Sequence, residues 1–153
     1  MSIQLIRASY EQMIKQLIYI DENRKDITDT LLANKLFLSK SGAHKYLKGY
    51  VHAVEAILAD ISVVEQICDF SGMRNGFLPF VIIDSDVTLT DKNSEAYCCH
   101  LTSNIYEQSS GSARMIYAFS ESGLELLLKE NNATCIMNIG KGYGEYTIHS
   151  VKV

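Results

Sequence analysis

The first half of the chain carries two long stripes of apolar residues that recur every three or four positions. The first stripe spans residues 9–35 and the second spans residues 47–68, and neither contains a proline. This spacing places apolar side chains on one face of a helix. Ser9, followed three residues later by Gln12, resembles a capping box at the start of the first stripe. The sequence therefore predicts two long amphipathic helices.

Between the stripes, residues 36–42 break the helical spacing and contain the serines and the glycine that could turn the chain. Two apolar stripes joined by a short turn leave water by facing each other, which predicts an antiparallel coiled-coil helical hairpin in a domain of residues 1–75. At about 1.5 Å per residue, arms of roughly 24 to 27 residues would reach on the order of 35 to 40 Å. We expect such a hairpin to protrude.

The second half changes character after residues 69–76, which have the glycine, serine and asparagine content of a linker. Residues 120–130 predict one short helix, with Ser120 as its N-cap. The apolar period elsewhere becomes two, or the residues become β-branched, which predicts strands. The predicted strands are residues 80–83, 86–90, 96–102, 114–119, 133–138 and 144–151. The fold class is therefore α+β: the hairpin, then a small antiparallel β-sheet domain with one short helix over residues 76–153.

Composition favours a globular chain: of 153 residues, 47% are hydrophobic and 21% are charged. No apolar run reaches the roughly 18 to 20 residues that a membrane span needs, and the first residues lack the apolar core of a secretion signal. We expect a cytoplasmic protein without a membrane partner. The cysteines, which form no CxxC pair, are expected to be reduced, with one of the adjacent Cys98 and Cys99 in a core.

Charge is distributed unevenly along the chain. Residues 1–75 carry nine Lys and Arg against nine Asp and Glu, whereas residues 76–153 carry five against nine. No carboxylate lies between Lys35 and Glu55, a stretch that holds a local basic cluster. Its members are Lys35, Lys40, His44, Lys45, Lys48 and His52. The cluster indicates a contact with something negatively charged rather than wholesale nucleic-acid binding.

The sequence contains no fingerprint of a metalloprotease, a nucleophile elbow, a Walker loop or a dinucleotide site. His44 and His52 share a helix face only roughly, and two solvated side chains are the simpler interpretation than a metal site. His100 and His149 fall in predicted strands that could be adjacent. We therefore expect no catalytic residue, no cofactor and no small-molecule substrate.

Two further patterns invite a ligand and have simpler explanations. Asp84, Asp86 and Asp91 depart from the spacing of a calcium loop, and the first two are better placed around a turn and a strand start. The glycines of residues 140–144 suggest a phosphate loop, but no helix follows, so a hairpin turn before the last strand explains them. No metal site is expected.

Several segments, taken in order, resemble the Gre family of bacterial transcription factors. Residues 10–19, YEQMIKQLIY, look like the family's first helix, and residues 38–41 look like its hairpin tip. Residues 120–129 resemble its SPxxxALLGK helix, and residues 87–91 and 145–148 resemble its opening and closing strands. The resemblance implies an N-terminal coiled-coil hairpin and a C-terminal domain similar to the FKBP fold.

In that family the hairpin passes down the secondary channel of RNA polymerase, and acidic tip residues help hold a magnesium ion for cleavage of backtracked RNA. Here the corresponding positions are Phe37 and Lys40, and the third carboxylate position of the motif is Ala43. Magnesium needs hard oxygen ligands and compensating negative charge. Phe37 supplies neither, and Lys40 is positive. The resemblance thus implies a polymerase-binding factor that does not stimulate cleavage by the usual route.

We therefore predict that the chain binds bacterial RNA polymerase and modulates or inhibits transcription, with its tip meeting RNA phosphates or the acidic catalytic residues of the polymerase. The predicted tip is Phe37, Leu38, Ser39, Lys40, Ser41 and Gly42, with Lys35, His44, Lys45 and Lys48 as a basic flank. The competing interpretation is that these lysines are only the solvated face of a helix.

The resemblance also suggests a contact with the rim of the polymerase channel at Phe119, Ser120 and Glu121, although the family's usual proline is replaced by Glu121. A coiled-coil protein–protein interaction module unrelated to polymerase remains an alternative function. A prolyl isomerase is a third possibility that the sequence disfavours, because such a pocket needs clustered aromatic side chains and the chain has no tryptophan.

Overall fold

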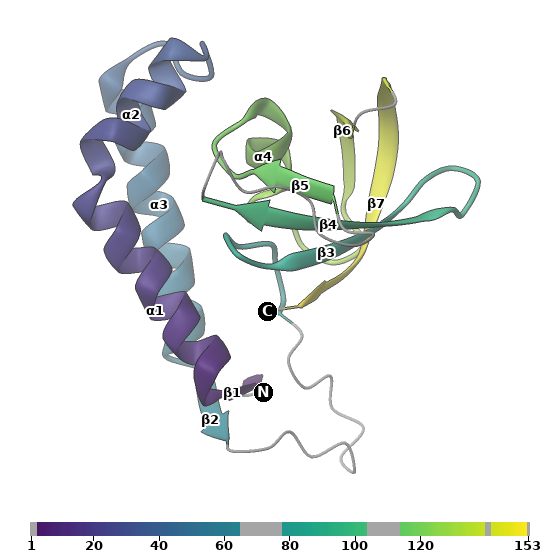
Figure 1. Cartoon of the computed structure of the whole chain (residues 1–153), viewed down its shortest axis with the longest axis horizontal. Helices are drawn as coiled ribbons and strands as arrows, with labels where there is room; N and C mark the ends of the chain where they lie inside the picture. The colour runs from purple at the N-terminus through teal and green to yellow at the C-terminus, as the bar shows by residue number, and fades with distance from the viewer. Residues whose placement is uncertain (1–2, 65–77, 104–113, 140–141, 153) are drawn as a thin grey trace. The chain divides into compact units, whose positions relative to one another are not determined.

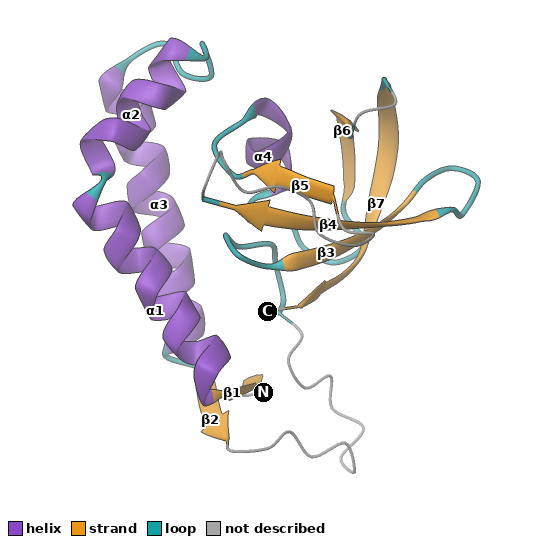
Figure 2. Cartoon of the chain, in the orientation of Figure 1, coloured by secondary structure: helices purple, strands orange, loops and turns teal. Residues whose placement is uncertain are grey.

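A computed structural model describes residues 3–64, 78–103, 114–139 and 142–152. The chain is an α+β protein that divides into two compact units, Met1–Phe77 and Leu78–Val153, and each unit is described by itself. The first unit is mainly helical, and the second is built on a five-stranded sheet. Figure 2 shows this division by secondary structure.

The first unit, called the helical unit below, contains three helices in its described residues (Figure 1). Its elements are β1 (Ile3–Ile6), α1 (Arg7–Glu22), α2 (Arg24–Ala33), α3 (Lys40–Leu58) and β2 (Ile61–Val64). Helices α1 and α2 follow one another along α3, which runs back in the opposite direction. Strands β1 and β2 pair in parallel, from Ile3 opposite Ile61 to Ile6 opposite Val64, at the end away from the α2–α3 connection.

The three helices bury the apolar stripes that the sequence predicts. The buried side chains of α1 and α2 include Met13, Ile20, Ile27 and Leu31, and those of α3 include Leu47, Tyr50, Val54 and Ile57. Removing this apolar surface from water is the main stabilising contribution in a unit of this size. One buried polar contact joins α1 to α3: the Tyr50 hydroxyl donates to Oε1 of Gln16. The pair is satisfied, so its burial does not leave an unmatched polar group.

The prediction of one continuous first helix from Ser9 is wrong at two points. Helix α1 begins at Arg7 after Ile6, and no side chain caps it, so the proposed capping box at Ser9 does not form. The helix breaks at Asn23, whose backbone lies outside the helical region at φ −113° and ψ 19°. The side-chain amide of Asn23 donates through Nδ2 to the carbonyl of Tyr19 at 2.9 Å. Asparagine competes locally for backbone groups in this way and weakens a helix interior.

The predicted second helix, residues 47–68, starts and ends too late. Helix α3 begins at Lys40 and ends at Leu58, and the chain then forms β2. Ile61, Val63 and Val64 are β-branched and favour the strand, and β1 supplies their hydrogen-bonding partner. Cys68 lies outside the described residues. At about 1.5 Å per residue, the 19 residues of α3 extend about 28 Å, less than the predicted arm.

The second unit, called the sheet unit below, has the strand order β5-β4-β3-β7-β6. Its elements are β3 (Asp86–Thr90), β4 (Ala96–Thr102), β5 (Arg114–Tyr117), α4 (Glu121–Leu126), β6 (Thr134–Asn138) and β7 (Tyr143–Lys152). Alternate residues of each strand enter the core, including Val87, Leu89, Leu101 and Ile148. The structure therefore confirms the strands predicted from the period-two segments, except that the strand predicted over residues 114–119 ends at Tyr117.

Two features of the predicted sheet are wrong. The sheet is mixed rather than antiparallel, because β4 and β5 pair in parallel. Residues 103–113 separate these strands, which is longer than a tight hairpin turn, and parallel neighbours need such a longer connection. Residues 80–83 do not form a strand: Phe80 makes one isolated bridge with Glu130, and residues 81–83 are buried. A continuous apolar run can be buried without belonging to a ladder.

Helix α4 packs so closely on the end of β5 that only glycine fits at position 123. A Cβ atom built there would lie 2.3 Å from the carbonyl oxygen of Tyr117 and 2.4 Å from that of Ala118. The short helix thereby fixes the segment that follows β5. None of the helices in the described part of the chain is long and apolar enough to cross a bilayer.

Candidate partner-binding tip of the helical unit

The α2–α3 connection, residues 34–39, is shaped by the way α2 ends. The Leu36 amide donates to the carbonyl of Leu31, and the Lys35 amide donates to that of Leu32, each at 3.0 Å. Lys35 has φ +57°. This combination is a Schellman motif, in which the left-handed position is usually glycine. The basic side chain of Lys35 is therefore presented from a backbone position that lysine rarely occupies.

Helix α3 begins with an N-cap at Ser39, whose Oγ accepts a hydrogen bond from the Gly42 amide at 3.1 Å. Lys40, Ser41 and Gly42 consequently form the first turn of α3, whereas the sequence predicted them in the loop. Residues 37–39 lie in the connection as expected. We call residues 34–42 the tip; they lie at one end of the helical unit (Figure 1).

Phe37 is half-buried and packs against the first turns of α3. Its ring lies 5.3 Å from the ring of Tyr46 on α3, centroid to centroid, at an interplanar angle of 48°. The Tyr46 hydroxyl is buried and has no hydrogen-bond partner among the described residues. Burial raises the pKa of Tyr46 to about 12, so the phenol stays neutral at physiological pH. Phe37 therefore contributes packing to the tip more than contact surface.

Leu38, in contrast to Phe37, points into solvent: its side chain is fully exposed, with a relative accessibility of 105%. Its neighbours Ser39, Lys40 and Ser41 are also exposed. An apolar side chain held in water at the end of a structured turn loses nothing by desolvation and gains by burial against a partner. The tip thus offers one apolar side chain among hydroxyl and ammonium groups.

The basic flank is on the surface throughout. Lys35, Lys40, His44, Lys45 and Lys48 are all exposed, and among the described residues none of the four lysines has an ion-pair partner. Their charges face solvent with no carboxylate nearby in the sequence between residues 30 and 54. Uncompensated positive charge of this kind attracts anionic groups over about a Debye length.

The tip offers no set of ligands for a hard metal ion. Phe37 and Lys40 carry no oxygen donor, and Ala43 is buried. Within the described residues no group of three or more His, Cys, Asp and Glu side chains could hold a metal.

The predicted rim-contact residues lie around the start of α4 and differ in exposure. Phe119 is 1% exposed and packs edge-on against Tyr117, so its side chain belongs to the core. Ser120 caps α4: its Oγ accepts from the Gly123 amide at 3.1 Å and donates to the Tyr117 carbonyl at 2.7 Å. Glu121 is exposed and accepts from the Tyr143 hydroxyl at 3.1 Å. Only Ser120 and Glu121 offer polar atoms to a partner here.

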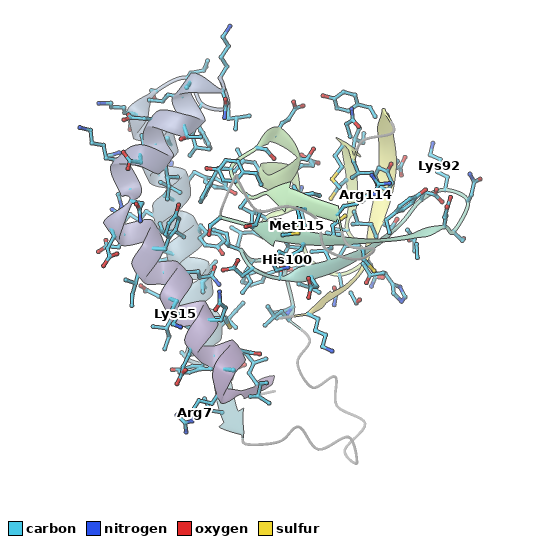
Figure 3. All side chains as sticks on the ribbon, viewed as in Figure 1. Arg7, Lys15, Lys92, His100, Arg114 and Met115 are labelled. Atoms are coloured by element: carbon cyan, nitrogen blue, oxygen red, sulfur yellow. The ribbon has the colours of Figure 1, made fainter. Side chains whose placement is uncertain are left out.

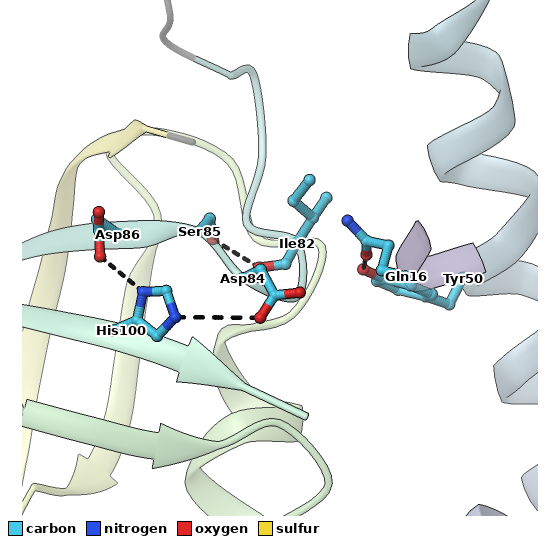
Figure 4. Close-up of polar contacts among 7 residues, drawn as sticks. All are labelled: Gln16, Tyr50, Ile82, Asp84, Ser85, Asp86 and His100. Atoms are coloured by element: carbon cyan, nitrogen blue, oxygen red, sulfur yellow. Dashed lines mark hydrogen bonds and ion pairs between the residues drawn. The ribbon is translucent and has the colours of Figure 1, made fainter. Parts of the chain in front are cut away.

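The structure brings together an Asp–His–Asp cluster that sequence reasoning missed (Figure 4). His100 Nδ1 lies 2.8 Å from Asp86 Oδ1, and Nε2 lies 4.0 Å from Asp84 Oδ1. The Ser85 hydroxyl between the two carboxylates donates to the Ile82 carbonyl at 2.6 Å. The cluster ties the turn before β3 to β4, which confirms the expected placement of Asp84 and Asp86 at a turn and a strand start.

The cross-strand register explains why this cluster escaped prediction. Asp86 pairs with His100 across β3 and β4, and nothing local in the sequence specifies that register. The possible adjacency of His100 and His149 is wrong, since β3 lies between β4 and β7. His44 and His52 are both exposed on α3.

The cysteines in the described residues are free thiols, as predicted. Cys99 is buried and Cys98 is exposed, so the adjacent pair divides between the core and the surface. Burial raises the pKa of Cys99 to about 11 and also raises the pKa of Cys135. Neither buried thiol is a reactive thiolate at neutral pH.

Among the described residues, the sheet unit has fewer cations than the helical unit, and two of them contact acceptor groups. Figure 3 shows Lys92 on the β3–β4 turn and Arg114 on β5. Lys92 lies 3.8 Å from Glu145, and Arg114 donates to the Ile139 carbonyl at 2.6 Å. The unengaged positive charge of the described residues is therefore concentrated in the helical unit.

Comparison with known proteins gives structural likenesses only. No family model matches the chain, and no curated protein matches it. Among solved structures it is similar to GreA factor homolog 1 of Thermus thermophilus, at 18% identity over 100% of both chains with a TM-score of 0.45.

The chain is also similar to the same factor of Thermus aquaticus, at 18% identity over 99% of both chains with a TM-score of 0.43. A third likeness is to the elongation factor GreA/GreB of Nitrosomonas europaea, at 17% identity over 100% of this chain and 99% of that one, with a TM-score of 0.42. These TM-scores are all below 0.5, which is too low to establish a shared fold.

Proposed function

We propose that the chain is a non-catalytic transcription factor that binds bacterial RNA polymerase and inserts the tip of its helical unit into the secondary channel. The tip contacts RNA phosphates or the acidic catalytic residues of the polymerase, and the factor modulates or inhibits transcription. The observation that carries this proposal is the tip with its basic flank: Leu38, Lys35 and Lys40 are exposed in the tip, and Lys45 and Lys48 are exposed behind it on α3. Residues 30–54 contain no carboxylate.

Three considerations support a channel-inserting role over a solvated helix face. The tip is structured by a Schellman motif, an N-cap and the Phe37–Tyr46 contact, so its side chains extend from a backbone held by defined contacts. Preorganised groups bind with a smaller entropy cost. The segments of the sequence that resemble the Gre family place the same residues at that family's tip. A basic, ligand-poor tip suits a negatively charged site and cannot supply magnesium ligands.

A second candidate function is that of a protein–protein interaction module with a partner unrelated to polymerase. Ile18 is 51% exposed and Tyr19 is 37% exposed on α1, away from the tip. Such apolar side chains on a helix surface suit packing against another helix. This function would depend on the α1 surface and would be indifferent to the charge of the tip.

Retention on immobilised core RNA polymerase tests the proposal against this alternative. The wild-type chain is compared with Lys40→Glu/Lys45→Glu and with the charge-matched control Lys92→Glu/Lys152→Glu in the sheet unit. We expect retention of the wild type and the control, and a loss on the order of tenfold or more for the tip variant, because reversed charges repel an acidic site. Equal retention of all three, or loss only on changing Ile18, would favour the interaction module.

A further inference from the structure

We propose that a groove between α2 and α3 binds a small molecule that carries two or more linked phosphates, such as pyrophosphate or a nucleoside triphosphate. The groove holds a cavity of about 330 Å³ and is lined by Arg24, Lys25, Thr28, Asp29, Lys40 and His44. This volume falls at the lower end of the range for small-molecule sites. The proposed site lies wholly in the helical unit and does not depend on the polymerase proposal.

Helical spacing directs these side chains toward one another. Arg24 and Thr28 are four residues apart on α2, as are Lys25 and Asp29, and Lys40 and His44 have the same spacing on α3. Residues at this spacing lie above one another on one helix face. Two helices thus contribute basic side chains to both walls of a single cavity, an arrangement that a solvated helix face does not require.

The charge of the groove is strongly positive. Arg24, Lys25 and Lys40 are three permanent cations, and Asp29 supplies the one carboxylate of the lining, which leaves a net charge of +2 with His44 neutral (3 − 1). Lys25 and Lys40 have no ion-pair partner in the described part of the chain. The groove therefore keeps its positive charge available for an anion.

Arg24 forms only one long, exposed ion pair among the described residues. Its Nη2 lies 3.6 Å from Asp21 Oδ1, between side chains that are 42% and 80% exposed, and exposed pairs of this kind contribute little. Its Nε is buried and finds no acceptor among the described residues. A small rotation of the guanidinium would turn that donor toward a ligand oxygen and satisfy it, with the fork geometry that suits phosphate.

The balance of charge favours linked phosphates over a nucleic-acid backbone. A phosphodiester carries one negative charge per phosphate, and consecutive phosphates of a strand follow an extended path. The groove concentrates a net charge of +2 in one cavity, which matches the two or more charges of pyrophosphate or a terminal triphosphate in the same small volume. Side chains of Lys25 and Lys40 from opposite walls could each donate to a different phosphate of one ligand.

Calorimetric titration of the full chain with pyrophosphate, ATP and inorganic phosphate, at physiological salt, tests this proposal without polymerase. We expect saturable binding of pyrophosphate and ATP with a Kd at or below about 1 mM, and binding of inorganic phosphate roughly tenfold weaker. Lys25→Gln and Lys40→Gln should each weaken pyrophosphate binding about tenfold, because each removes a charge-assisted hydrogen bond. Asp29→Asn should strengthen binding, because it removes the opposing charge.

The matched control is Lys15→Gln, which removes one exposed lysine from α1 of the same unit but not from the groove and should leave binding unchanged. Circular dichroism of each variant verifies that α2 and α3 remain folded. The proposal is overturned by an absence of saturable pyrophosphate binding, by an equal loss in Lys15→Gln, or by weaker binding in Asp29→Asn. A single-stranded RNA without terminal phosphate that binds more tightly than pyrophosphate would also overturn it.

Discussion

At the scale of single residues, Lys35 combines a backbone cost with a surface charge. Its left-handed conformation, at φ +57°, closes the end of α2. A residue with a Cβ atom pays about 1 to 2 kcal/mol for that conformation, whereas glycine does not. The positive charge of Lys35 at the tip offsets this backbone cost if a partner binds there.

Replacing Lys35 by glycine should therefore stabilise the helical unit by up to about 1 kcal/mol, after allowing for the greater freedom of glycine in the unfolded chain. Urea unfolding followed by circular dichroism measures the change. The matched control is Lys45→Gly in the exposed part of α3, which should destabilise by about 1 kcal/mol. Equal destabilisation by both changes would contradict the assigned Schellman motif.

Tyr46 carries a buried hydroxyl with no partner in the described residues, and its pKa is raised to about 12 by burial. Because the pKa in the folded chain exceeds the ordinary value near 10, the folded state binds the proton more tightly. The contribution of the protonated Tyr46 phenol to the free energy of unfolding is fully present below about pH 10 and is lost as the pH rises toward 12.

Tyr46→Phe keeps the ring against Phe37 and removes the unmatched hydroxyl, so it should leave stability unchanged or raise it by up to about 1 kcal/mol at neutral pH. It should also reduce the loss of stability between about pH 10 and 12. Denaturant unfolding at a series of pH values measures both effects. The exposed-face control Tyr19→Phe should keep the wild-type pH dependence; an unchanged alkaline loss in Tyr46→Phe would disprove the burial argument.

At the scale of elements, the sequence predicted what local patterns determine. The strands β3, β4, β6 and β7 and the short helix α4 follow from alternation and from the Ser120 N-cap, and the structure confirms them. The helix ends at Leu126, however, and does not extend over the predicted residues 120–130. The break at Asn23 and the change from α3 to β2 escaped prediction because they depend on competition between local and tertiary contacts. The parallel pairing of β4 with β5 is likewise a tertiary choice.

The candidate site was predicted in its composition and only partly in its geometry. The basic residues of the tip are visible in the sequence, and all of them are on the surface. Phe37 faces Tyr46 and Phe119 lies in the core, which no spacing rule indicates. The α2–α3 groove and the contact of His100 with Asp86 were missed because each joins residues at least 11 positions apart in the sequence through packing.

Two glycines in helices test how closely the elements pack. Gly49 in α3 has nothing within 4 Å of a Cβ atom built there, so Gly49→Ala should stabilise the helical unit by about 1 kcal/mol. Gly123→Ala in α4 should destabilise the sheet unit by about 3 kcal/mol, because the Cβ would overlap the Tyr117 carbonyl oxygen. Thermal unfolding of the two variants compares them directly, and similar effects of the two changes would refute the packing of α4.

At the scale of the whole molecule, the basic tip belongs to the helical unit, and the sheet unit carries more carboxylates than cations. Among the described residues, the sheet unit also has fewer free cations than the helical unit. The contacts that hold the tip lie in the helical unit alone. The proposed action is occupation of a negatively charged site by ammonium groups and one exposed leucine.

RNA cleavage in stalled elongation complexes tests this central claim most directly. The chain is added to backtracked complexes of bacterial RNA polymerase, and both RNA shortening and renewed extension are measured. A tip with Phe37 and Lys40 in place of carboxylates should produce no shortening and should slow extension, whereas Lys40→Glu should relieve the slowing and move the tip toward cleavage. Robust RNA shortening that depends on the wild-type chain would contradict the account.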